Sequence, residues 1–117
     1  MELKEFFTAV GGNYENVLTR LPSESFAKKF LFKFLQDESY ALLKDSLSNK
    51  DFSTAFRAAH TLKGVCLNLG FDRLLQSASA ITEVLRGGNN PPSYLFEAVT
   101  KDYNEVIENL KLLFAVN

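Results

Sequence analysis

The chain has 117 residues, of which 46% are hydrophobic, and its formal net charge at pH 7 is −1. This length suits one domain, so we expect residues 1–117 to form a single domain, and the hydrophobic content argues against disorder. The near-zero net charge does not favour nucleic acid or an anionic membrane as a partner.

Helical periodicity runs through almost the whole sequence, and the continuous alternation typical of strands is absent. Glycine and proline lie at plausible breaks, and Asn13, Ser23 and Asp51 are candidate N-caps. Gly70 is a candidate left-handed helix stop. In chain order, helices are predicted over residues 3–10, 14–21, 24–47 with a possible bend near Asp37, 51–69, 71–86 and 92–116.

The last four predicted helices are amphipathic and joined by short connections, which favours an all-α fold. We predict an antiparallel up-down four-helix bundle in residues 23–116. Short helices in residues 1–22 would pack against the bundle or across it. Phe32 lies off the apolar stripe of its helix, so it either covers an N-terminal helix or is exposed.

The only histidine, His60, lies in the helix predicted over residues 51–69. With about 100° of rotation per residue, the apolar residues of this helix share an arc centred roughly 130° from His60. The arc holds Phe52, Ala55, Ala59, Leu62, Cys66 and Leu69. We therefore expect His60 on a flank that reaches solvent, and Cys66 as a buried, unreactive thiol.

The neighbours of His60 on this flank form a pattern. Gly64 lies one turn further along nearly the same line, although glycine in a helix interior costs roughly 1 kcal/mol relative to alanine. Leu67 lies two turns further, and Arg57 and Lys63 lie about 60° to either side. The imidazole should thus stand over bare backbone, between two cations and above an apolar spot.

A lone histidine is most often an unremarkable surface residue, so its possible chemistries need comparison. A zinc site needs three or four protein ligands, and the chain has no second histidine or cysteine. A hydrolytic triad needs a nucleophile and a carboxylate at a recognisable spacing, and none appears near His60. A neutral imidazole can instead attack phosphorus and carry a phosphoryl group. Gly64 would leave room for a partner, and Lys63 with Arg57 would supply positive charge.

These residues resemble the signature of the histidine-containing phosphotransfer (HPt) family. In that family, lysine and glycine follow the histidine at the third and fourth positions, and Leu-Gly follows later. Here HTLKG begins at His60, and NLG ends at Gly70. The stretches FSTAFRAAHTLKG and FDRLLQSASAITEVLRGG, the second including Glu83 and Arg86, extend the resemblance to roughly residues 10–112. Many members have a small residue such as serine where this chain has Cys66.

The resemblance implies a four-helix bundle with an exposed phosphoryl acceptor, His60. The acceptor would exchange its phosphoryl group with an aspartate on receiver domains of response regulators or hybrid histidine kinases. Lys63 would assist electrostatically, and no intrinsic cofactor or metal is implied, because Mg²⁺ is expected from the receiver. The candidate docking residues are Arg57, Thr61, Gly64 and Leu67, the last from helix geometry alone.

The expected setting of such a carrier is cytoplasmic and monomeric. One thiol cannot build an internal disulfide framework, which fits a reducing compartment. The first residues, MELKEFF, lack the basic start and apolar run of a signal peptide. No segment approaches the length of a membrane span.

Two classes of function remain open. The first is a phosphocarrier without kinase activity of its own, and the second is an interaction or scaffold module that keeps the bundle but carries no phosphate. The combination of His60, Lys63 and Gly64 favours the carrier, because a scaffold has no need of all three. An autonomous enzyme is the weakest alternative, since there is no Gly-rich nucleotide loop and no recognisable carboxylate pair.

Overall fold

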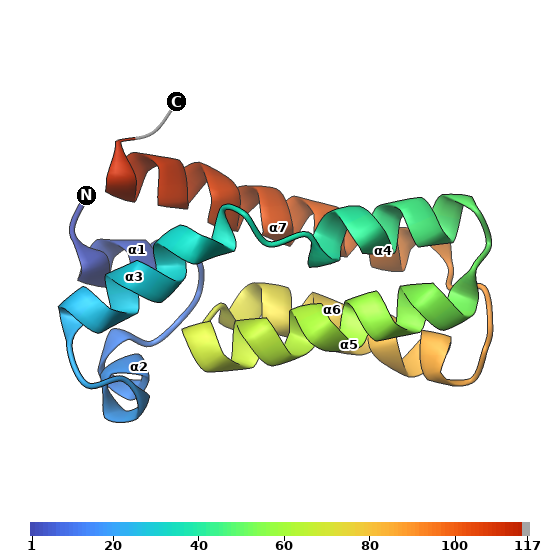
Figure 1. Cartoon of the computed structure of the whole chain (residues 1–117), viewed down its shortest axis with the longest axis horizontal. Helices are drawn as coiled ribbons and strands as arrows, with labels where there is room; N and C mark the ends of the chain where they lie inside the picture. Colours follow the sequence, from blue (N-terminus) through green and yellow to red (C-terminus); the bar gives the residue numbers. More distant parts are fainter. Residues whose placement is uncertain (116–117) are drawn as a thin grey trace.

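The computed structural model describes residues 1–115, which contain seven helices and no strand (Figure 1). The all-α prediction is therefore confirmed. The predicted end of the last helix at Val116 lies outside the described residues. The helices are α1 (Leu3–Ala9), α2 (Tyr14–Arg20), α3 (Glu24–Phe34), α4 (Ser39–Ser48), α5 (Phe52–Leu69), α6 (Asp72–Arg86) and α7 (Ser93–Phe114).

The prediction of a single helix over residues 24–47 is wrong, because the structure divides this segment into α3 and α4. The backbone N–H groups of residues 35–37 donate to carbonyls three residues earlier at 3.0–3.2 Å, which tightens the chain and ends α3. The Asp37 carboxylate then accepts the N–H of Ser39 at 2.9 Å, which satisfies a donor at the start of α4. The possible bend near Asp37 is therefore a complete break in the helix.

The starts of α2, α3 and α5 and the end of α5 follow local sequence signals. The predicted N-caps Asn13, Ser23 and Asp51 each accept a backbone N–H from three residues further on, at 2.9–3.1 Å. Gly70 ends α5 with φ of 75°, the left-handed conformation expected of a glycine stop. These boundaries depend on the chain within a few residues of each cap.

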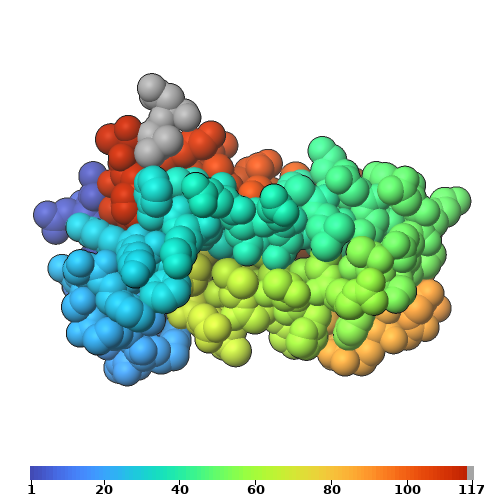
Figure 2. All heavy atoms as spheres, viewed as in Figure 1, coloured from blue at the N-terminus to red at the C-terminus, as the bar shows by residue number. Residues whose placement is uncertain are grey.

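Helix α5 packs against both α4 and α6, and α6 also packs against α7. Successive helices from α4 to α7 run in alternating directions (Figure 1). The buried side of α5 matches the predicted arc, with Ala58 as an addition and Phe52 only half-buried. Figure 2 shows that the uncovered side of α5 forms part of the molecular surface, beside α3 and α4. No helix of the described residues is long and apolar enough to cross a bilayer.

The two short helices α1 and α2 pack against α7 and α5, respectively, as predicted for the N-terminal segment. Helix α1 buries the rings of Phe6 and Phe7, and the ring of Phe6 meets that of Phe71 edge-on with 6.0 Å between centroids. Phe71 also meets Phe34 of α3 at 5.0 Å. Of the two alternatives for Phe32, the structure shows exposure: its side chain is 46% exposed, and its ring rests against Phe114 of α7.

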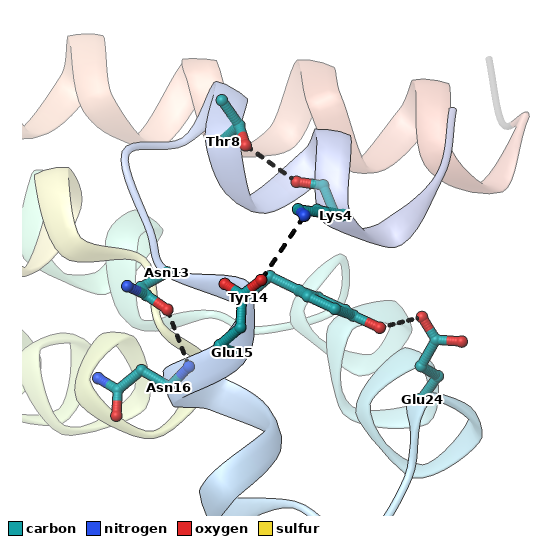
Figure 3. Close-up of polar contacts among 7 residues, drawn as sticks. All are labelled: Lys4, Thr8, Asn13, Tyr14, Glu15, Asn16 and Glu24. Carbon is teal, nitrogen blue, oxygen red and sulfur yellow. Dashed lines mark hydrogen bonds and ion pairs between the residues drawn. The ribbon is translucent and has the colours of Figure 1, made fainter.

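Close backbone contacts complete this end of the molecule. A Cβ at Gly12 would lie 2.2 Å from the carbonyl oxygen of Gly70, and a Cβ at Gly70 would lie 2.3 Å from Val17 Cγ2. The Tyr14 hydroxyl donates to the Glu24 carboxylate at 2.6 Å, which ties α2 to α3 (Figure 3). We call this region the N-terminal junction, and its central residues are Phe6, Phe7, Gly12, Val17, Gly70 and Phe71.

Candidate functional site

His60 lies in the middle of α5 and is exposed, as the helical wheel predicts. Lys63 is half-buried beside it, Gly64 is exposed, and Leu67 exposes 57% of its surface. Residues three and four apart on a helix are neighbours, so α5 alone brings these residues together. We call His60, Lys63, Gly64 and Leu67 the His60 face.

The surroundings of Gly64 show why the His60 face is accessible. A Cβ at Gly64 would have no atom within 4 Å beyond its own stretch of helix. Internal packing therefore does not require glycine at this position, although glycine lowers helix stability by roughly 1 kcal/mol relative to alanine. The missing side chain leaves bare backbone one turn from the imidazole, where another molecule could approach closely.

A cluster of side chains on the α6 flank of His60 extends the site. The ring of Phe56 lies 5.8 Å from the imidazole, measured between centroids, and is tilted by 37°. The Arg86 guanidinium carbon lies 5.1 Å from the Phe56 centroid, over the ring. The Arg86 Nε donates to the Glu83 carboxylate at 2.8 Å. Phe56 thus separates His60 from an ion pair on α6.

The site roles of Phe56, Glu83 and Arg86 were not predicted from the sequence. Phe56 precedes His60 by one helical turn, so the i, i+4 spacing was a usable signal. Glu83 and Arg86 were noted only as part of a stretch that resembles the family. Their position beside Phe56 depends on how α6 packs against α5, which no local pattern encodes.

This flank carries side chains of both signs, the cations Arg86 and Lys63 and the carboxylate of Glu83. Hydrogen bonding and charge from Arg86 hold the pKa of Glu83 below its ordinary value, and the charges of Lys63 and His60 act in the same direction. Glu83 therefore stays ionised near neutral pH and lies within electrostatic range of both residues. The site contains one carboxylate among its cations.

Two predicted docking residues lie on the other flank of α5. Arg57 and Thr61 are exposed and line a recess that α5 forms with the first residues of α4. Arg57 Nη2 also donates to the Thr54 hydroxyl at 3.3 Å, so this guanidinium is held toward the start of α5. The two predicted cations therefore lie on different flanks, with Lys63 on the α6 side and Arg57 on the α4 side.

Leu67 lies at the end of the His60 face and adjoins the N-terminal junction. Its backbone carbonyl accepts a hydrogen bond from Arg20 Nη2 at 3.3 Å. Helix α2 thus reaches the edge of the site, a contact between distant parts of the chain that the sequence did not suggest.

The thiol of Cys66 faces away from this site. Its side chain is buried, and burial together with the nearby Asp37 charge raises its pKa, so the thiolate is disfavoured. Within residues 1–115, no three His, Cys, Asp or Glu side chains converge as a metal ion would require.

Comparison with protein-family models decides the family of this chain. The model of the Hpt domain matches residues 31–110. The chain belongs to the Hpt domain family. Hpt domains act in histidine phosphotransfer and interact with receiver domains. Searches of curated proteins and of solved structures found no match.

The matched range contains the complete site. It includes the His60 face and both of its flanks, whereas α1, α2 and most of α3 precede it. From the sequence, the resemblance was expected to begin near residue 10. The family match begins at residue 31, about 20 residues later. The N-terminal junction is therefore built largely from residues outside the family match.

Proposed function

We propose that this Hpt domain is a histidine phosphocarrier in a multistep phosphorelay. His60 would exchange a phosphoryl group with the aspartate of receiver domains, and the protein would act as a cytoplasmic monomer. The observation that supports this most strongly is the exposed imidazole one turn from Gly64, where no side chain obstructs approach. We further propose that α4, α5, α6 and α7 serve as the family's antiparallel four-helix bundle.

The proposed reaction is a nucleophilic displacement at phosphorus. A nitrogen of neutral His60 attacks the aspartyl phosphate of the receiver, so that an N–P bond forms while the acyl O–P bond breaks. The aspartate leaves as a carboxylate on the receiver. The reverse reaction breaks the N–P bond and regenerates the imidazole. No group of this chain needs to bind nucleotide.

The surrounding residues have distinct proposed roles. Lys63 offsets the negative charge of the phosphoryl oxygens, because it lies next to His60 on the same side of α5. Gly64 and Leu67 offer a low, partly apolar surface to the rim of the receiver's active site. Arg57 and Thr61 extend that surface toward α4, and the receiver supplies the Mg²⁺ that phosphoryl transfer uses.

The decisive experiment is phosphorylation by labelled receiver proteins. Wild-type protein should gain one acid-labile phosphoryl group that maps to His60, and His60→Gln should gain none. Label on the His60→Gln variant would refute His60 as the acceptor. A wild-type chain that binds receivers but accepts no phosphoryl group would instead be a scaffold module.

A second experiment separates the carrier from an autonomous kinase. Incubation with ATP and Mg²⁺, without kinase or receiver, should leave the intact mass unchanged. A phosphate-cradling loop would be needed to use ATP directly, and the sequence contains none. The gain of one phosphate from ATP alone would contradict the carrier proposal and favour an enzyme.

A further inference from the structure

The His60 site contains a carboxylate that a phosphoryl acceptor does not require. Glu83 of α6 pairs with Arg86, whose guanidinium lies over Phe56, and the Phe56 ring lies 5.8 Å from the imidazole between centroids. A phosphoryl group at neutral pH carries between about one and a half and two negative charges. An ionised carboxylate in this position therefore repels the group that the site is meant to hold.

The second observation is that Arg86 pairs with Glu83. Its guanidinium lies over Phe56 at 5.1 Å and donates to Glu83 at 2.8 Å. Arg86 lies on the far side of Phe56 from the imidazole, and a guanidinium without an acidic partner could turn its donors toward phosphoryl oxygens on His60. The Arg86 Nε donates to Glu83, so the carboxylate acts on the site both by its own charge and by partly neutralising a neighbouring cation.

We propose that Glu83 weakens the hold of this site on the phosphoryl group and so promotes its release from His60. The inference deepens the proposed phosphocarrier function and rests on it. Glu83 makes no covalent bond in this scheme. It modulates the stability of phosphorylated His60 through charge.

The chemistry of release shows how the carboxylate would act. In hydrolysis, water attacks phosphorus, the N–P bond breaks, and the imidazole nitrogen leaves as it takes up a proton. In transfer, the receiver's aspartate replaces water as the nucleophile. A nearby negative charge favours hydrolysis, because it repels the phosphoryl group before the bond breaks, does not repel neutral water, and stabilises the imidazole that takes up a proton from that water. Transfer gains from the same repulsion of the phosphoryl group, offset by repulsion of the receiver's carboxylate, so hydrolysis shows the effect of Glu83 most directly.

The test measures the lifetime of phosphorylated His60 without any partner protein. Phosphoramidate, a small phosphoryl donor, would form the N–P bond while its own P–N bond breaks and ammonia leaves. The decay of the phosphohistidine signal would then be followed by ³¹P NMR at low salt. Glu83→Gln should lengthen the half-life about two- to fivefold, the range expected of one exposed charge.

Three controls separate charge from structure. Glu83→Asp keeps the carboxylate and should decay at nearly the wild-type rate. Glu108→Gln removes an exposed carboxylate from α7 and should leave the lifetime unchanged. High salt should reduce the difference between wild type and Glu83→Gln, because ions screen exposed charges. A merely structural role of Glu83 would show no such salt dependence.

The possible outcomes distinguish this inference from the proposed function. An unchanged or shorter half-life in Glu83→Gln, or an equal lengthening in Glu108→Gln, would overturn the inference. A longer half-life in Glu83→Gln with no transfer to any receiver would retain the inference and overturn the phosphorelay proposal. Where phosphoramidate does not label His60, a phosphorylated receiver would be used to load it and then removed before the decay is followed. If neither donor labels His60, both the inference and the phosphorelay proposal are overturned.

Discussion

Gly64 and Gly70 lie near the same end of α5, yet a methyl group would meet opposite surroundings at the two positions. At Gly64 it would find no atom within 4 Å, whereas at Gly70 it would lie 2.3 Å from Val17 in a residue with φ of 75°. Glycine is needed at Gly70 for the fold, and Gly64 has no such need. Glycine thus serves close packing in the N-terminal junction and access to the surface on the His60 face.

The two regions also differ in whether their large side chains are buried or exposed. The N-terminal junction buries Phe6, Phe7 and Phe71 in edge-to-face contacts, while the His60 face leaves its imidazole and Leu67 exposed. Helices α1 and α2 precede the family match but contribute to the same buried core as α5. Substitutions in the junction should therefore change stability, and those on the His60 face should change phosphoryl transfer.

The largest expected effect on stability is that of Phe6→Ala. Removal of a fully buried ring that contacts Phe71 should lower the free energy of unfolding by about 3–5 kcal/mol. Urea denaturation would measure this loss of stability. Phe32→Ala is the control, because it removes the same ring from a half-exposed position. If the two variants lost similar stability, α1 would not belong to the core in the way that the structure indicates.

Gly70→Ala should cost about 1–3 kcal/mol, because the new methyl would press on Val17 and an alanine would be strained at positive φ. Gly88→Ala is the matched control, since Gly88 has φ of 77° but no atom within 4 Å of a Cβ. The control isolates the backbone strain, and the excess cost at Gly70 measures the clash. Equal losses of stability in denaturation would refute the clash with Val17.

Substitution of Gly64 by alanine should raise the stability of the protein and lower its rate of phosphoryl transfer. Gly64→Ala should raise the free energy of unfolding by up to about 1 kcal/mol, because alanine favours the helix and meets open space. Transfer from a phosphorylated receiver should slow, and Gly64→Leu should slow it further while the protein remains folded. Normal transfer in both variants would place the docking surface elsewhere.

Lys63→Ala should change stability by no more than about 0.5 kcal/mol, since the side chain leaves no buried cavity. It should nevertheless slow receiver-to-His60 transfer, measured by rapid quench, because a positive charge beside the phosphoryl group is lost. Lys101→Ala on the exposed surface of α7 is the control. A wild-type rate in Lys63→Ala would reduce Lys63 to an ordinary surface charge.

The smallest effect concerns the cap of α5 and its dependence on pH. Hydrogen bonds from the side chain and backbone of Thr54 hold the pKa of Asp51 below its ordinary value, so the ionised cap is stabilising. That stabilisation is complete above the ordinary carboxyl pKa and is lost as pH falls through the lowered one. Wild type should therefore lose more stability than Asp51→Asn between pH 6 and pH 2. Parallel thermal unfolding curves across this range would contradict the role of the charge.

Helix positions and the exposure of His60 could be predicted because both depend on local chemistry. A cap such as Asn13 or Asp51 bonds to a backbone group three residues away, and Gly70 needs only its own left-handed conformation. Likewise, the spacing of His60, Lys63 and Gly64 places them on one side of α5 whatever the helix packs against. Even the missed contact between Phe56 and His60 follows from this spacing.

The contacts between helices could be decided only by the tertiary structure. The break between α3 and α4 falls in the polar run QDES at residues 36–39, where the sequence indicated a possible bend but not a complete end of the helix. The contact of Arg86 with Phe56 depends on the rotation and register of α6 against α5, and that of Arg20 with Leu67 on where α2 docks. Such positions are set by how whole helix faces fill a shared core. The sequence by itself therefore determined the exposed position of His60 beside Lys63 and Gly64, and the tertiary structure decided which side chains of α6 lie near it.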